Sequence, residues 1–155
     1  MTICEDIGLV YPTDCPYYLM SRATLVMTSA FKKAFSAAGV RNVRPSYLGV
    51  LWCLWREEGV KTVDLGRCAG LEPSTMTGLL DRMERDGFVA RSPDPDDRRV
   101  QIIQLTDTGR TIRKTVMRMV NETLGILFEG ISKEDIERTN DVLRKVLANA
   151  HGGNG

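Results

Sequence analysis

The chain lacks any long apolar segment. None of its hydrophobic runs approaches the roughly 20 residues that a helix needs to cross a bilayer. Its N-terminal stretch, MTICEDIGLV, also lacks the basic start and apolar core of a secretory signal. These absences predict a cytoplasmic protein with no membrane partner.

Histidine and paired cysteines are also scarce. The four cysteines, Cys4, Cys15, Cys53 and Cys68, include no CxxC pair, and the single histidine is His151. This argues against a structural zinc site and a secreted disulfide framework, so we expect Cys53 and Cys68 to be packed core thiols. Without a histidine partner or a Gly-rich phosphate loop, neither an enzyme nor a cofactor or metal is expected. A cysteine peroxidase acting through Cys15 is the enzymatic alternative.

The chain carries almost no net charge. Its 21 Lys and Arg residues nearly balance 20 Asp and Glu residues, which leaves +1 over 155 residues. This size suits a single domain with a substantial core. Near-neutrality argues neither for nor against a nucleic-acid partner, so any DNA-binding surface must come from the local arrangement of charges.

Two long amphipathic helices are predicted, one beginning near Pro16 and ending at Gly39, the other spanning roughly 107–128. The core stripes are Met20, Ala23, Met27, Ala30, Phe31, Ala34 and Ala38 in the first, and Ile112, Val116, Met119, Val120, Thr123 and Leu127 in the second. Second apolar faces follow Tyr18, Leu25 and Val26, and Met117, Leu124, Phe128 and Ile131. Because one small core cannot cover both faces, a second subunit is expected. Ser132 and Asp135 resemble a capping box that opens a final helix.

Two shorter helices are predicted directly after the first long one. Pro45 and Ser46 open a helix, and Thr62 is placed to cap another, which ends at the tight turn that Gly70 permits. The buried side of the first is predicted to be Leu48, Leu51, Trp52 and Trp55.

The helix that starts at Pro73 has two different faces. Its apolar side consists of Met76, Leu79, Leu80 and Met83. Its other side is small or hydrogen-bonding: Ser74, Thr77, Gly78, Asp81, Arg82 and Arg85. A helix that enters a DNA groove needs such a pair of faces, although an ordinary surface helix would fit them equally well.

A charged hairpin follows. Gly87 ends the helix, Phe88 to Arg91 form a short strand, SPDPDDRR is an exposed turn, and Val100 to Leu105 return as the second strand. Arginines at such a tip, Arg98 and Arg99, suit the narrow minor groove of DNA. Taken alone, such a turn is more often just a solvated hairpin.

This order of elements resembles the MarR family of bacterial transcriptional regulators. The stretch LEPSTMTGLLDRMERDGFVARSPDPDDRRVQIIQLTDTG contains the family's DxR wing signature at residues 97–99 and its LTxxG motif at Leu105, Thr106 and Gly109. The resemblance covers Pro16 to Ala148. It implies a mainly α-helical fold with a small β-hairpin wing: a winged helix-turn-helix lobe over 45–106, a helical dimerisation region over 1–44 and 107–150, and a disordered tail over 151–155.

The resemblance also implies a homodimer that binds a pseudo-palindromic site in double-stranded DNA. The matching DNA-binding positions are Ser74, Thr75, Thr77, Gly78, Asp81, Arg82, Arg85, Asp97, Arg98 and Arg99. Arg99 would enter the minor groove and Asp97 would hold it. One departure is Glu72, which stands where the family often has a serine cap and whose charge is unfavourable near phosphates.

The family resemblance implies control by a small, often aromatic or phenolic, effector that makes the protein release DNA. Candidate effector-binding residues are Tyr18, Arg22, Tyr47, Leu51 and Trp55, each of which could equally be a core or dimer contact. Oxidation of Cys15, next to Pro16 at a helix start, is the alternative control. A winged-helix module that binds protein instead of DNA is a further alternative.

Overall fold

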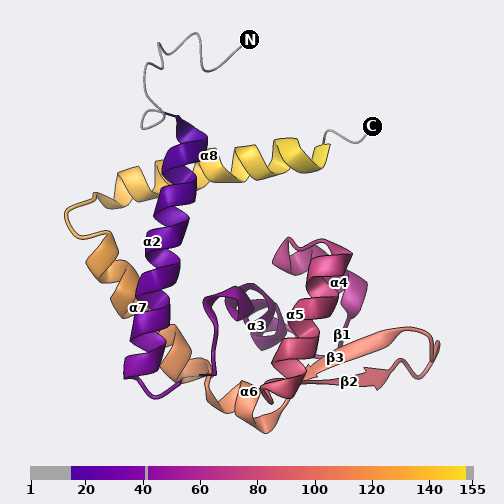
Figure 1. Ribbon diagram of the computed structural model, residues 1–155. Coiled ribbons are helices and arrows are strands. Elements are labelled where there is room, and N and C mark those ends of the chain that lie inside the picture. Colours follow the sequence, from indigo (N-terminus) through magenta and orange to yellow (C-terminus); the bar gives the residue numbers. More distant parts are fainter. Residues whose placement is uncertain (1–14, 41, 153–155) are drawn as a thin grey trace. The chain divides into compact units, whose positions relative to one another are not determined.

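The protein is described by a computed structural model that covers residues 15–40 and 42–152. The described residues form two compact units, which divide between Thr123 and Leu124. In order, the elements are α2 (Pro16–Ala37), η2 (Pro45–Tyr47), α3 (Leu48–Arg56), β1 (Val60–Lys61), α4 (Thr62–Ala69), α5 (Pro73–Arg85), β2 (Val89–Pro93), β3 (Gln101–Leu105), α6 (Asp107–Thr111), α7 (Arg113–Leu127) and α8 (Lys133–Gly152) (Figure 1). This mainly helical fold with a small sheet confirms the predicted class. Within the described residues, no helix has the length and apolar character to cross a membrane.

Proline marks the starts of three helical elements, as predicted. Pro16, Pro45 and Pro73 each occupy the first turn, where the missing N–H has no intrahelical partner in any case. The element at Pro45 begins as a 3₁₀ turn before α3. Gly70 ends α4 with φ of 66°, a left-handed conformation that glycine adopts without steric cost.

The core of the first unit lies between α3, α4, α5 and the sheet. Its fully buried side chains include Tyr47, Val50, Leu51, Leu54, Leu65, Met76, Leu80, Met83, Val89 and Ile103. The predicted underside of α5 is confirmed, since its four apolar residues are at most 3% exposed. The prediction for Trp52 was wrong: it is 46% exposed, and its Nε1 donates to Met117 Sδ at 3.1 Å.

The sheet has three antiparallel strands in the order β1-β3-β2, one more than the predicted hairpin. Ile103 of β3 stands opposite Val60 on one side and Arg91 on the other. Because Val60 and Lys61 form a strand, Lys61 takes the N-cap position of α4. Thr62 does not cap this helix, and its hydroxyl donates to the Gln101 carbonyl at 3.2 Å.

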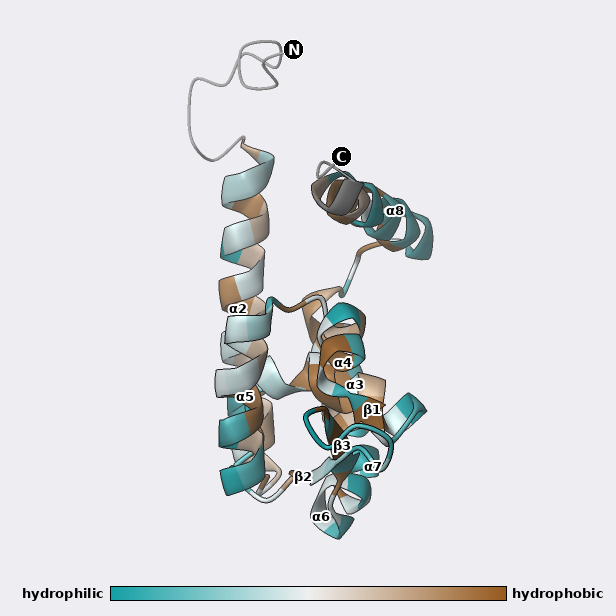
Figure 2. Ribbon diagram, turned by 90° about the vertical axis from the view of Figure 1, so that its right-hand side faces the viewer, coloured by the Kyte–Doolittle hydropathy of each residue, from teal (hydrophilic) through white to brown (hydrophobic). Residues whose placement is uncertain are grey.

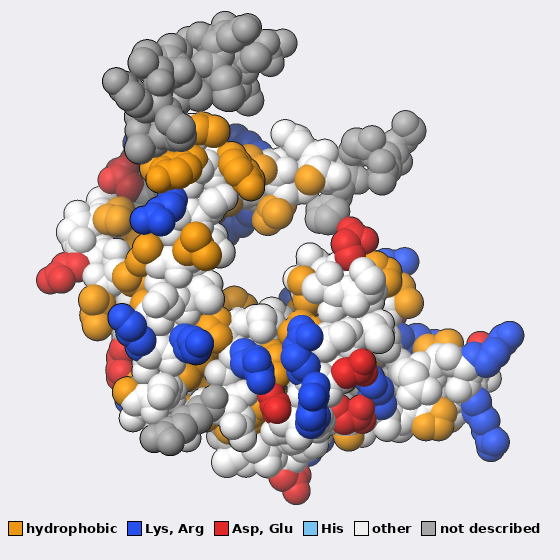
Figure 3. Space-filling model, in the orientation of Figure 1, with side chains coloured by type: hydrophobic (Ala, Val, Ile, Leu, Met, Phe, Trp, Pro, Cys, Tyr) orange, Lys and Arg blue, Asp and Glu red, His pale blue; other side chains and the backbone are white. Residues whose placement is uncertain are grey.

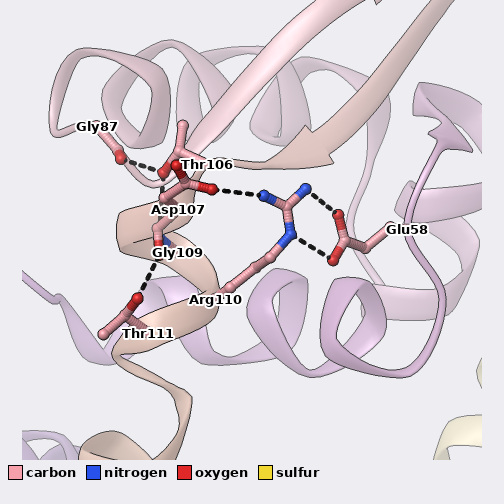
Figure 4. Close-up of polar contacts among 7 residues, drawn as sticks. All are labelled: Glu58, Gly87, Thr106, Asp107, Gly109, Arg110 and Thr111. Carbon is pink, nitrogen blue, oxygen red and sulfur yellow. Dashed lines mark hydrogen bonds and ion pairs between the residues drawn. The ribbon is translucent and has the colours of Figure 1, made fainter.

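The segment after the sheet is held by a compact set of polar contacts (Figure 4). Thr106 caps α6 as predicted: its Oγ1 accepts from the Gly109 N–H at 3.0 Å and donates to the Gly87 carbonyl at 2.6 Å. Arg110 reaches across to Glu58 through two hydrogen bonds of 2.9 and 2.7 Å. These contacts tie the start of α6 to the ends of α3 and α5.

The predicted continuous helix over 107–128 is interrupted at Ile112, which separates α6 from α7. Trp55 Nε1 donates to the Gly109 carbonyl at 2.9 Å. In an unbroken helix, the Gly109 carbonyl would accept a hydrogen bond from the backbone N–H of Arg113, four residues later. The indole therefore replaces an intrahelical donor at the point where the helix breaks.

Helices α2 and α8 expose large apolar side chains. On α2 these are Tyr17, Tyr18, Leu19, Leu25 and Val26, and on α8 they are Val142, Leu143, Val146 and Leu147. Figure 2 shows brown segments along much of α2. By contrast, Met117, Leu124 and Phe128 of the second predicted stripe are half-buried within the chain.

Helix α8 begins at the predicted Ser132–Asp135 box, where the Asp135 N–H donates to Ser132 Oγ at 3.1 Å, and continues to Gly152. Residues 153–155 of the predicted tail lie outside the described part.

Candidate nucleic-acid interface

The outer face of α5 presents the predicted polar side chains to solvent. Ser74, Thr75, Thr77, Arg82 and Arg85 are exposed, while Gly78 is half-buried under the Arg82 side chain. Basic side chains gather over this part of the molecule in Figure 3. Glu72 is the N-cap, and its side chain makes no capping hydrogen bond. The face therefore combines hydrogen-bonding groups and cations on a helix whose other side is anchored in the core.

The two acidic side chains of α5 form ion pairs with an arginine from the sheet. Arg91 of β2 pairs with Asp81 at 2.6 Å and with Glu84 at 3.2 Å. Its side chain is only 25% exposed, so this triad also fastens α5 to β2. Arg82 and Arg85 make none of the ion pairs found among residues 15–40 and 42–152. Their positive charge is therefore available to a phosphate backbone.

The predicted Asp97–Arg99 pair is present at the tip of the wing, the hairpin of β2, β3 and their connecting turn. Both carboxylate oxygens accept from the guanidinium, at 3.0 and 3.1 Å. These bonds lower the pKa of Asp97, with the Arg99 side chain as the main cause. The Arg99 side chain is 90% exposed, so the pair holds a cation in solvent at a fixed position.

An ion pair at the base of the wing turn was not predicted. Asp94 is 3% exposed and accepts from Lys61 Nζ at 3.0 Å and from the Asp96 N–H at 2.8 Å. The Asp96 amide and then Lys61 lower the pKa of Asp94. Because the folded-state pKa is depressed, this contact stabilises the wing above the ordinary carboxyl pKa and is lost as pH falls through the folded value. Asp94 therefore positions the wing, whereas its acidic neighbours lie on the surface.

Replacing Asp94 with alanine should detach the turn from β1 and weaken DNA binding several-fold. Asp96→Ala is the matched control, because it removes the same charge from an exposed position. Removing a surface acid favours binding to phosphates, so the control should bind DNA slightly more tightly. Fluorescence anisotropy with labelled duplex measures both affinities. If DNA affinity changed in the same direction in both variants, the lost negative charge alone would explain the change.

The five candidate effector-binding residues are not equally accessible. Tyr18 and Arg22 are exposed on α2, and Trp55 is half-buried. Tyr47 and Leu51, however, are 0% exposed and belong to the core. The Tyr47 hydroxyl donates to Asp86 Oδ2 at 2.6 Å, at the end of α5, and burial followed by this bond raises the pKa of Tyr47. Both residues are therefore enclosed and offer no surface to a ligand in this structure.

The cysteines differ from the prediction of separate core thiols. Cys53 of α3 and Cys68 of α4 form a disulfide, and Cys68 lies on the surface. Their 15-residue separation gave no signal of pairing, because the contact depends on how α3 packs against α4. Cys15 is a free, half-buried cysteine at the N-cap of α2.

Comparison with known proteins agrees with this geometry. The family model described as MarR family matches residues 45–100, which contain α5 and most of the wing. A MarR-family transcriptional regulator from Rhodococcus sp. RHA1 is 30% identical, with a TM-score of 0.71 over 95% of this chain and 96% of that one. This chain belongs to the MarR family. As a MarR-family protein it is a DNA-binding transcriptional regulator and not an enzyme.

Two further similar proteins have names that mention different small molecules. CouR from Rhodococcus jostii RHA1, solved with p-coumaroyl-CoA bound, is 28% identical, with a TM-score of 0.74 over 89% of this chain and 95% of that one. The organic hydroperoxide resistance transcriptional regulator of Bacillus subtilis is 26% identical over 88% of this chain and 90% of its own length.

Proposed function

We propose that this MarR-family protein is a homodimeric repressor that binds a pseudo-palindromic operator and releases it when a small aromatic or phenolic effector binds. The outer face of α5 beside an arginine-tipped wing is the observation that carries this proposal. Its partner is chromosomal double-stranded DNA, which places the protein in the cytoplasm. The lobe over 45–106 would bind DNA, and the regions 1–44 and 107–150 would form the dimer.

In this proposal α5 lies in the major groove and the wing reaches the minor groove. Thr77 and Arg82 would contact base edges, with Ser74, Thr75 and Gly78 allowing close approach of the helix. Arg85 and Arg98 would contact phosphates, and Arg99 would enter the minor groove. Asp81 and Asp97 would act through their arginine partners, since each carboxylate is already bonded within the lobe.

The proposed occupant of the exposed apolar faces of α2 and α8 is a second copy of this chain. Leu25 is 63% exposed and Leu147 is 61% exposed. Each helix exposes several large apolar side chains, and large apolar patches are rare on monomers and typical of protein interfaces. A dimer would also set two α5 helices at the spacing that a two-fold operator requires.

The proposed effector class follows from CouR, whose bound p-coumaroyl group carries a phenol ring. Tyr18, Arg22 and Trp55 remain the candidate contacts, because they combine aromatic surface with a cation on accessible parts of α2 and α3. A thermal-shift screen with phenolic acids and their CoA thioesters tests this class. A ligand that both raises the melting temperature and releases DNA supports the proposal, and a panel without such a ligand argues against it.

Binding of the full chain to the DNA upstream of its own gene tests the DNA-binding part. We expect a salt-sensitive complex that persists in the presence of excess random DNA. The absence of a specific complex at low salt would contradict the DNA-binding proposal.

Within that complex, Thr77→Ala and Arg82→Ala should change base preference by roughly 1–3 kcal/mol for each lost contact. An equal loss on all sequences would assign these residues to phosphates instead.

A second candidate is a redox-controlled regulator of the same fold. It is favoured by the free Cys15 at the start of α2 and by the likeness to the hydroperoxide resistance regulator. Organic hydroperoxide should then release DNA from the wild-type protein and leave Cys15→Ser bound. Release from both proteins would exclude Cys15 as the sensor.

A further inference from the structure

Outside the DNA-binding surface, a disulfide between Cys53 and Cys68 links α3 to α4. Their Cα atoms are 6.2 Å apart, within the usual range of about 4.4–6.8 Å for a disulfide. Helices α3 and α4 also pack together independently of the bond: a Cβ built at Gly49 would lie 3.7 Å from the Ala69 carbonyl oxygen. The two sulfurs would therefore stay close after reduction.

We propose that Cys53 and Cys68 are a reversible dithiol–disulfide site that exchanges with small-molecule disulfides such as oxidised glutathione. A protein that acts on chromosomal DNA works among reducing thiols, where disulfides are usually transient or regulatory. The site is separate from Cys15, and its chemistry does not depend on the proposed operator or effector.

The two cysteines have different surroundings, which assigns their roles. Cys68 is exposed, and Arg56 Nη2 lies 4.0 Å from its Sγ, where the positive charge favours the thiolate. Cys53 is only 9% exposed. Cys68 is therefore the sulfur that meets a small disulfide, and Cys53 is the sulfur that resolves the product.

The exchange proceeds in two balanced steps. The Cys68 thiolate attacks one sulfur of the small disulfide, which forms a mixed disulfide and releases one small thiolate. The Cys53 thiolate then attacks Cys68 Sγ, which closes the protein disulfide and releases the second small thiolate. Two protein thiols lose two electrons and two protons, and the small disulfide becomes two thiols. Reduction by excess small thiol runs the same steps in reverse.

Closing the disulfide would stabilise the DNA-binding lobe. It joins α3 to the last turn of α4, and only three residues separate the end of α4 from the start of α5. A crosslink of this kind restricts the unfolded chain, so the melting temperature should rise by about 5–10 °C on oxidation. The redox state would thereby set how readily the lobe opens.

The test uses the full chain with Cys4→Ser and Cys15→Ser, which leaves only this pair. The protein is equilibrated in glutathione buffers, quenched with acid and alkylated, so that only free thiols are labelled. One transition between doubly alkylated and unalkylated protein is expected. The unalkylated protein, which holds the disulfide, should have the higher melting temperature. A pair that stays closed in fully reduced glutathione, or stays open in oxidised glutathione, would overturn the proposal.

Single variants in the same background test the roles. Cys53→Ser should accumulate a mixed glutathione disulfide at Cys68, whereas Cys68→Ser should remain unmodified while folded. Arg56→Gln should slow modification of Cys68 several-fold without lowering the melting temperature. Equal modification of Cys53 and Cys68 would overturn the assignment of attacking and resolving sulfurs. Because these readouts need no DNA, they stand apart from any failure of the operator proposal.

Discussion

Gly109→Ala should lower the free energy of unfolding by about 3 kcal/mol, at the upper end of the usual cost of overpacking. A Cβ at this position would collide with the carbonyl oxygen of Phe88 and come within 3.1 Å of Leu105 Cδ2. The Phe88 carbonyl cannot easily move away, because it accepts from the Thr106 N–H at 3.0 Å. For a chain of this length the melting temperature should fall by about 6–12 °C, which calorimetry or circular dichroism measures.

Gly125→Ala is the matched control for this change. Gly125 lies inside α7, where an added Cβ meets no other atom within 4 Å. Alanine there should stabilise the helix by about 0.5–1 kcal/mol. The two substitutions add the same methyl group and should shift stability in opposite directions. Wild-type stability in Gly109→Ala would show that the junction between α5, β3 and α6 can adjust.

Arg99→Ala should weaken DNA binding by about 1–3 kcal/mol for each wing in the complex. The guanidinium is 90% exposed at the tip of the hairpin and fixed by Asp97, so it can enter a narrow groove with little loss of side-chain freedom. The loss should be similar on most sequences. The slope of log affinity against log salt should also fall by about one for each lost phosphate contact.

Arg118→Ala controls for the lost charge, because Arg118 pairs with Glu122 on α7, away from the lobe. It should leave both affinity and salt slope close to the wild-type values. Sedimentation measurements on both variants should show the same assembly as the wild type. If Arg99→Ala kept the wild-type affinity and slope, the wing would have no contact with DNA.

The sequence predicted the features that depend on near neighbours. Proline at helix starts, the apolar side of α5 and the Thr106 cap each involve residues close in the chain, whereas the Asp97–Arg99 pair was expected from the resemblance to the MarR family. The strand β1 was missed because a two-residue strand has no period of its own and exists through its pairing with β3. The Lys61–Asp94 pair was missed for the same reason, since 33 residues separate its partners.

The burial of Tyr47 and the interruption of the predicted long helix also have non-local causes. Tyr47 looked suitable for a ligand because it is aromatic and polar, yet its hydroxyl finds Asp86 across the core. Next to the break at Ile112, the Gly109 carbonyl accepts from Trp55, which lies 54 residues away in the sequence. Neither partner could be identified by spacing along the sequence.

The internal pairing of the acids in the DNA-binding lobe has a consequence for how the regulator finds its site. Asp81, Glu84, Asp94 and Asp97 each bond a lysine or arginine of the lobe. Because these bonds neutralise part of the positive charge of the lobe, its binding to random phosphates should be weaker than that of a simple basic patch, which matters because a genome offers about 10⁶–10⁹ competing sites. Under the proposed function, specific contacts from α5 and the wing, and not net charge, would then decide which DNA site a small number of protein copies occupies.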